Sequence, residues 1–332
     1  MRKLILPRIA AGMLRTLATL AFVSVGMMPA SAQTNRFGPD YFSNLPVVDQ
    51  HGRTLRFYDD VIRGKIVVIS FIYTSCRDIC PLVTARLAQV EEKLGELAGK
   101  EVHFVSISID PDNDTPQKLK EHADAFRVGP GWQFLTGKRD DIAFIRHKLG
   151  ERSRSLGEHR NEIVLGNDRT GDWSRDSAFT DINVLTMTIR GMDPVRREAA
   201  ARNLQQDKTS AILDTDVLPG QALFSKACVG CHTIGKGPRI GPDLAGVTDR
   251  RDRAWLANFM IAPEAMRARN DPIAVELGRT YKTVRMPTLG LSEDDAADLI
   301  GYLEFQSYRL TAPTAATPAA QGAHHAHEHH HH

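Results

Sequence analysis

Hydrophobic and polar positions alternate along residues 37–188 in a strand and helix rhythm. The runs 65–73 and 101–110 are rich in β-branched residues, which predicts two buried strands. Between them, residues 84–99 place apolar side chains at helical spacing, so a strand-helix-strand unit with a parallel pair is expected. The rhythm continues with helices and strands at 116–126, 132–137, 140–150 and 162–167. This pattern predicts a central sheet with helices on both faces.

Other patterns flank this segment. The sequence PVVDQHGRTLRF predicts a small hairpin that turns at residues 50–52. Residues 192–217 are charged and poor in β-branched side chains, which is typical of a connecting helix or linker. Residues 218–308 show no strand pattern and predict an all-α domain. Its last helix should begin after Ser292, with Asp295 completing a capping box.

The two ends of the chain are excluded from the fold. Residues 1–32 contain four basic side chains, no acidic one, an apolar stretch and Ala-Ser-Ala, which predicts a signal peptide cleaved after Ala32. A retained membrane anchor is the alternative, although the apolar stretch is shorter than the ~20 residues of a spanning helix. Residues 309–332 predict a disordered, His-rich tail, either native or a purification tag.

Composition and charge limit the classes of partner that this chain is expected to bind. A chain of 332 residues with 42% apolar and 25% charged residues is ordinary globular material for about two domains. Loss of residues 1–32 leaves 38 basic against 40 acidic side chains, so neither nucleic acid nor an anionic membrane surface is an expected partner. Export to the periplasm would place all four cysteines outside the cytosol, where unprotected thiols oxidise.

The second cysteine pair lies in the sequence CVGCH. Its spacing is that of a haem-attachment motif, in which Cys228 and Cys231 bind the porphyrin covalently and His232 is an axial ligand of the iron. Met286, in a loop before the last helix, is the expected second axial ligand, while Met260 and Met266 lie in helical patterns that favour core packing. A redox dithiol is the alternative, but it would call for a strand-helix-strand context.

Residues 218–308 resemble the class I cytochrome c family in these motifs and in GPDLAGV. The resemblance implies one covalent haem c with both axial positions filled by protein. Thioether ligation raises the reduction potential of the iron, so this domain is expected to carry electrons.

The first pair, Cys76 and Cys80, lies in TSCRDICP after a predicted strand. If both lay on one helical turn, their Cβ atoms would be about 5–6 Å apart, wider than the roughly 3.5–4.5 Å of an unstrained disulfide. Two thiolates on one metal ion tolerate that separation, and with an imidazole they suit copper or zinc. Arg77 is expected to lower the pKa of a neighbouring thiol. The imidazole candidates are His51, His103, His122, His147 and His159.

Residues 33–191 resemble the Sco/SenC family of copper-binding proteins with an α/β thioredoxin-like fold. The resemblance rests on Cys76-xxx-Cys80-Pro81, on Asp78, and on the two motifs Ser108-Ile109-Asp110-Pro111 and Asp114-Thr115-Pro116. It implies His159, shortly before a late strand, as the third copper ligand. Two departures stand out: Arg77 replaces the usual proline, and Glu158-His159-Arg160 replaces Asp-His-Ser.

Three functions follow from these features. The first is an exported copper metallochaperone that uses Cys76, Cys80 and His159 to assist the dinuclear copper centre of cytochrome c oxidase, with a redox partner protein. The second is a thiol-disulfide oxidoreductase that uses Cys76 and Cys80 as redox groups. The third is an electron-transfer cytochrome with a docking domain. Since one haem carries one electron, it matches copper cycling better than a two-electron dithiol, which favours the metallochaperone over a conventional enzyme.

Overall fold

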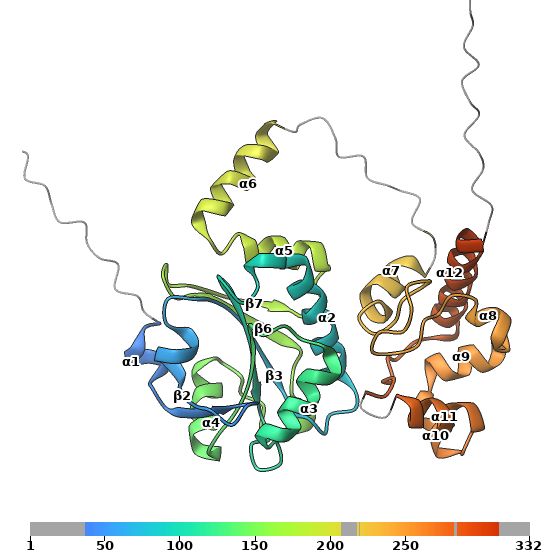
Figure 1. Cartoon of the computed structure of the whole chain (residues 1–332), viewed down its shortest axis with the longest axis horizontal. Helices are drawn as coiled ribbons and strands as arrows, with labels where there is room; N and C mark the ends of the chain where they lie inside the picture. The colour runs from blue at the N-terminus through green and yellow to red at the C-terminus, as the bar shows by residue number, and fades with distance from the viewer. Residues whose placement is uncertain (1–36, 207–217, 219, 282–283, 312–332) are drawn as a thin grey trace, which may run out of the picture. The chain divides into compact units, whose positions relative to one another are not determined.

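The computed structural model describes residues 37–206, 218, 220–281 and 284–311. The predicted signal peptide lies outside the described residues, as do most of the second half of the predicted linker and residues 312–332 of the predicted tail; residues 309–311, predicted as disordered, instead end the last helix. The strands are β1 Pro46–Asp49, β2 Thr54–Arg56, β3 Ile66–Ile72, β4 Val102–Ser108, β5 Trp132–Thr136, β6 Glu162–Asn167 and β7 Asp172–Ser177. They form a single mixed sheet in the order β2-β1-β5-β4-β3-β6-β7 (Figure 1).

The parallel core of this sheet is β3, β4 and β5, and the predicted strand-helix-strand unit is confirmed. The hairpin of β1 and β2 is confirmed as well, with its turn at the expected place. β6 runs antiparallel to β3, and β7 pairs with β6 at the sheet edge. No strand was expected at β7, because DWSRDS is mostly polar. β7 is the edge strand of the sheet and none of its residues is fully buried, so it needs few apolar side chains.

Helices cover both faces of the sheet. They are α1 Pro39–Phe42, α2 Ile79–Leu94, α3 Pro116–Phe126, α4 Arg139–Lys148, α5 Ile182–Arg190 and α6 Pro194–Gln206. A π-helix, Phe57–Ile62, lies between β2 and β3. β3 is buried along its whole length, and its side chains alternate between two cores. One core receives Ile66, Val68 and Ile72, and the other receives Val67, Ile69 and Phe71. The continuous apolar run of β3 thus follows from burial on both faces.

The C-terminal part is helical, apart from an isolated bridge between Thr233 and Asp243. Its helices are α7 Gln221–Leu223, the π-helical Phe224–Cys228, α8 Val247–Arg250, α9 Arg253–Ile261, α10 Pro263–Ala268, α11 Pro272–Thr280 and α12 Glu293–Thr311. The capping box of α12 is confirmed: Ser292 Oγ accepts from Asp295 N at 3.1 Å and Ser292 N donates to Asp295 Oδ2 at 2.9 Å.

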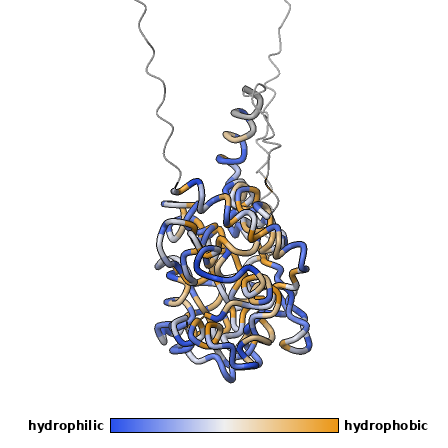
Figure 2. Tube along the Cα trace, turned by 90° about the vertical axis from the view of Figure 1, so that its right-hand side faces the viewer, coloured by the Kyte–Doolittle hydropathy of each residue, from blue (hydrophilic) through white to orange (hydrophobic). Residues whose placement is uncertain are grey.

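Apolar and polar segments separate as this architecture requires. Figure 2 shows hydrophobic stretches gathered in the interior and hydrophilic stretches over the outer turns. In the part of the chain that the structure describes, every helix is too short or too polar to cross a bilayer.

Candidate metal centres

The first cysteine pair lies where β3 meets α2. Cys76 is in the loop before the helix, and Cys80 is the second residue of α2. The two cysteines therefore do not share a helical turn, which corrects the geometry considered from the spacing. Instead, the Cys76 sulfur lies 3.5 Å from the backbone nitrogen of Cys80. Since N–H groups at a helix N-terminus carry partial positive charge, this position stabilises a thiolate at Cys76.

The two thiols of this pair have opposite acidities. A hydrogen bond from the Cys80 thiol, assisted by the Tyr73 hydroxyl, lowers the pKa of Cys76. The same hydrogen bond and burial raise the pKa of Cys80, and the pKa of Tyr73 is also raised, chiefly by burial. These groups, rather than Arg77, have the largest effects on the Cys76 thiol. The site thus combines one thiolate with one protonated, fully buried thiol.

Asp114 fixes the loop that carries Cys76. Its carboxylate is completely buried and accepts hydrogen bonds from Thr74 N at 3.1 Å and from the hydroxyl groups of Thr74 and Ser108. Ser108 is the last residue of β4, so the acid joins the loop to the neighbouring strand. Asp114 belongs to a motif that carried the family resemblance, but its anchoring role depends on contacts that the sequence does not display.

Four of the candidate histidines lie in other surroundings, although His122 is one side chain from Cys80: its Nε2 lies 3.2 Å from Thr84 Oγ1, which donates to the Cys80 carbonyl oxygen. His51 and His147 are exposed. His103 is the second residue of β4 and pairs with Val67, so it lies at the far end of the sheet from the cysteines. His122 contacts the rings of Phe126 and Phe134, and burial lowers its pKa to about 4.

His159 lies just before β6. Because β6 is antiparallel to β3, with Val164 opposite Ile69, the residues before Glu162 lie toward the end of β3 where the cysteine loop begins. The imidazole is buried, and its Nδ1 lies 3.3 Å from Glu151 Oε2. Within the described residues, no three metal-binding side chains are close enough together to hold one ion. The soft thiol and imidazole donors suit copper, but the His159 imidazole must move closer to Cys76 and Cys80 before all three can bind one ion.

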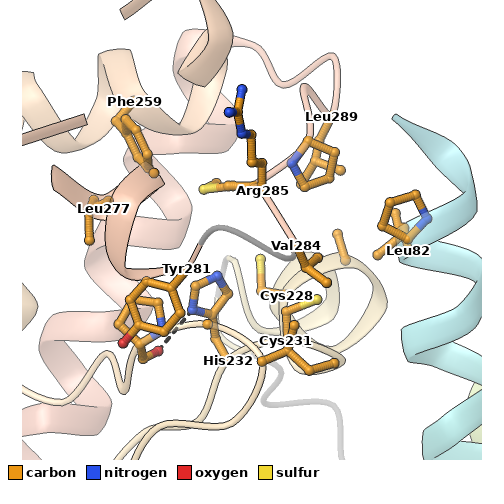
Figure 3. Close-up of a pocket in the computed structure, with 18 of the residues that line it drawn as sticks. Leu82, Cys228, Cys231, His232, Phe259, Leu277, Tyr281, Val284, Arg285 and Leu289 are labelled. Carbon is orange, nitrogen blue, oxygen red and sulfur yellow. Dashed lines mark hydrogen bonds between the residues drawn. The ribbon is translucent and has the colours of Figure 1, made fainter. Parts of the chain in front are cut away.

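The second cysteine pair faces a cavity in the helical region. Cys228, His232 and Met286 line it from different segments. Figure 3 shows the sulfur atoms of Cys228 and Cys231 and the ring of His232 gathered at one side of this cavity. Burial raises the pKa of Cys228 to about 12 and that of Cys231 to about 11. Both thiols are protonated before any thioether bond forms.

His232 is held in one orientation. Its Nδ1 lies 2.9 Å from the carbonyl oxygen of Pro242, and burial lowers the pKa of the imidazole. A Cβ atom on Gly241 would lie 2.6 Å from His232 Cε1, so only glycine allows the ring this position. With Nδ1 donating to the carbonyl, Nε2 remains free to bind iron. These residues therefore fit a haem. The CVGCH motif alone gave no sign that Gly241 and Pro242 orient His232.

The three methionine candidates differ in position. Met286 and Met260 line the cavity, whereas Met266 is buried in the neighbouring core with Phe259 and Ala274. Met260 lies within α9, and Met286 lies in the loop before α12. The backbone carbonyl of Met286 accepts a hydrogen bond from Arg267 Nη2 at 3.2 Å. Met286 as the second axial ligand remains a prediction, which its place at the cavity supports.

Two family models match separate parts of the chain. Residues 32–160 match the family model SCO1/SenC, and residues 217–306 match the family model Cytochrome c. The resemblances stated from the sequence are thereby confirmed for these two parts of the chain: residues 32–160 are similar to SCO1/SenC proteins and residues 217–306 to cytochrome c.

Several curated relatives match the first of these domains. An SCO1 protein homolog from Bacillus subtilis is 36% identical over 77 residues, which are 23% of this chain and 39% of that protein. An SCO2-like protein from Rickettsia typhi is 31% identical over 140 residues, 40% of this chain and 64% of the relative. A protein from Stutzerimonas stutzeri, named for copper binding, is 29% identical over 106 residues, 32% of this chain and 50% of its own. The chain thus spans less than two thirds of each relative.

Proposed function

We propose that this chain is an exported, periplasmic copper metallochaperone with a fused, electron-carrying haem c. Cys76, Cys80 and His159 would hold the copper ion as cargo. The acceptor would be the copper-bearing subunit of cytochrome c oxidase, or another periplasmic copper or thiol acceptor. The observation that carries the proposal is the activated Cys76 beside the buried Cys80, at the sheet end toward which the chain from His159 runs. The copper-binding name of the Stutzerimonas relative supports it.

The proposed haem gives a reason for the presence of a cytochrome c domain and a copper site in one chain. When bound through Cys228 and Cys231, a haem supplies a one-electron couple, and copper changes its charge by one electron between Cu(II) and Cu(I). His232 and Met286, which line the cavity, would hold the haem iron, and the haem would supply electron transfer rather than substrate chemistry. The chain would set the oxidation state of its copper before passing the ion to the acceptor by ligand exchange.

Metal analysis tests the copper assignment. The mature protein is loaded with copper, desalted, and analysed for copper and haem together. About one copper per haem is expected, because two cysteine sulfurs and one imidazole, with the Cys80 proton released on binding, would form a single soft site. The double change Cys76→Ser and Cys80→Ser should abolish copper retention and leave the haem unchanged. Full copper retention in that variant would refute the assignment.

A thiol-disulfide oxidoreductase is the second candidate. A thiolate at Cys76 with a protonated, 1% exposed Cys80 beside it is the arrangement of an attacking and a resolving thiol. In such a reaction the Cys76 thiolate attacks a substrate disulfide and forms a mixed disulfide with one substrate sulfur. Cys80 then attacks the Cys76 sulfur, which releases the substrate as a dithiol and leaves a Cys76–Cys80 disulfide. Reduction of a disulfide substrate that persists after His159→Ala and after removal of copper would favour this function.

A further inference from the structure

The segment between α4 and β6 contains a buried acid that faces the proposed copper ligand His159. Glu151 Oε2 lies 3.3 Å from His159 Nδ1, and the two side chains are 8% and 3% exposed. Burial of a carboxylate costs free energy unless it is paired, and here the imidazole is one of its partners. The pair is therefore built into the fold rather than formed by chance at the surface.

The orientation of Glu151 is fixed by its other contacts. Its Oε1 accepts a hydrogen bond from the backbone nitrogen of Ser153 at 2.8 Å and lies 3.7 Å from Arg146 Nη2. Arg146 also donates to the carbonyl and the hydroxyl oxygens of Ser153. One oxygen of the acid is thus held by the chain, and the other is directed at the imidazole.

This cluster is attached to the sheet end that leads to the cysteines. Arg146 Nη1 lies 3.5 Å from the carbonyl oxygen of Ile109, directly after β4. Ile109 N in turn donates to the carbonyl oxygen of Ile72, the last residue of β3, at 2.8 Å. The chain from Ile72 continues into the loop with Cys76. Glu151 and the cysteine loop are therefore both attached to the ends of β3 and β4.

We propose that Glu151 is a positioning residue for copper binding: its carboxylate accepts the Nδ1 proton of His159 and leaves the Nε2 lone pair for the metal. A carboxylate on the outer nitrogen of a metal-binding histidine fixes the tautomer and the ring orientation and increases the basicity of the ligand. This inference rests on the proposed function, in which His159 is the third copper ligand. It adds a residue for which neither the cysteine motif nor the histidine position gives a signal.

The first experiment uses the metal-free protein and does not depend on copper. Two-bond proton-nitrogen correlation spectra of the nitrogen-labelled holocytochrome, recorded where the imidazole is neutral, report the tautomer of His159, which is assigned by comparison with His159→Ala. The wild type should show the Nδ1–H form. Glu151→Ala should shift the ring toward the Nε2–H form that free histidine prefers. An Nε2–H form in the wild type would overturn the proposal.

The second experiment measures Cu(II) affinity by anaerobic competition with a chelator. Glu151→Ala should weaken binding by about 10–100-fold, the range for loss of an outer-shell partner. Glu151→Gln, which preserves the shape and one acceptor oxygen, should weaken it less. Glu162→Ala is the matched control: it removes a nearby acid that pairs with Arg175 at 3.2 Å and is about half exposed. That control should bind copper like the wild type.

The outcomes separate this inference from the proposed function. Unchanged or tighter copper binding in Glu151→Ala would overturn the positioning role, and tighter binding would show that the acid holds the imidazole back. Unchanged binding in His159→Ala, with binding lost in the cysteine double variant, would refute the ligand set itself. If Glu151→Ala does not fold, Glu151→Gln still tests the positioning role, because the His159 tautomer and the Cu(II) affinity of that variant are measured in the same way.

Discussion

The two cysteine pairs of this chain place the same side chain in two different environments. At Cys76 a hydrogen bond from Cys80, with help from Tyr73, lowers the thiol pKa. At Cys228 and Cys231 burial raises the pKa of both thiols, to about 12 and about 11. The first pair lies at the end of a strand before a long helix, whereas the second lies against an apolar cavity.

The proposed roles of the two pairs account for this difference. A metal ligand or an attacking nucleophile must be a thiolate, so the protein supplies hydrogen-bond donors to Cys76. A sulfur that becomes part of a thioether needs no stabilised charge, so an apolar environment that holds the haem is sufficient. The surroundings of a cysteine, more than the spacing of a pair, therefore indicate its chemistry.

Removal of the second pair has the largest expected effect. The double change Cys228→Ala and Cys231→Ala eliminates both thioether bonds, so haem should be extracted completely by acidified organic solvent. Copper binding at Cys76 should persist in this variant, because the first pair lies in a separate domain. Haem that resists extraction in the double variant would contradict the assignment of these cysteines.

Asp114→Ala should be the most damaging change in the α/β domain outside the cysteines. It leaves the amide and hydroxyl of Thr74 and the hydroxyl of Ser108 without their buried acceptor. The free energy of unfolding should fall by about 2–4 kcal/mol, as measured by denaturant titration. Asp112→Ala, at an exposed acid that pairs with Arg139, is the control. A loss in Asp114→Ala no larger than in the control would remove the anchoring role.

Tyr73→Phe tests the cause of the lowered Cys76 pKa. In the holoprotein, alkylation of Cys76 should stay fast at neutral pH and slow only as the pH falls through the lowered pKa, where the thiolate becomes protonated. Loss of the Tyr73 hydroxyl should move this profile to higher pH and slow alkylation below its midpoint by roughly tenfold. Cys80 should react slowly throughout, since its pKa is raised. An identical profile in Tyr73→Phe would assign the effect to Cys80 alone.

The smallest expected effect concerns the haem domain. Ser292→Ala removes the N-terminal cap of α12 and should lower stability by about 1 kcal/mol. Unfolding followed at the haem absorption band should move to lower denaturant, while unfolding of the α/β domain should not change. The exposed Thr288→Ala, in the preceding loop, serves as control. Equal shifts in both variants would argue against the capping box.

Local patterns in the sequence predicted much of this fold. The helix at 116–126 and the strand at 162–167 have the predicted bounds, because their apolar spacing and their flanking residues agree. The start of α2 was placed too late, since Pro81 discourages a helix assignment although proline fits a first turn. β7 was missed because it is a polar edge strand.

The site was predicted less completely than the fold. The motifs pointed to both cysteine pairs and to His159, whose roles remain predictions, but not to the side chains that contact them. Thr74 and Asp114 are 40 residues apart, and Glu151 and His159 are 8 apart across an irregular segment. Such contacts depend on how strands and loops meet in space, and periodicity does not record them.

Electron transfer between the two cofactors tests the central claim most directly. The protein with ferrous haem is mixed anaerobically with one equivalent of Cu(II), and the haem spectrum is followed. Each Cu(II) should take one electron from one ferrous haem, giving Cu(I) and ferric haem, with a rate constant independent of protein concentration. The reaction should be lost with Cys76→Ser and Cys80→Ser. A haem that stays ferrous in protein that retains Cys76 and Cys80 would contradict the account.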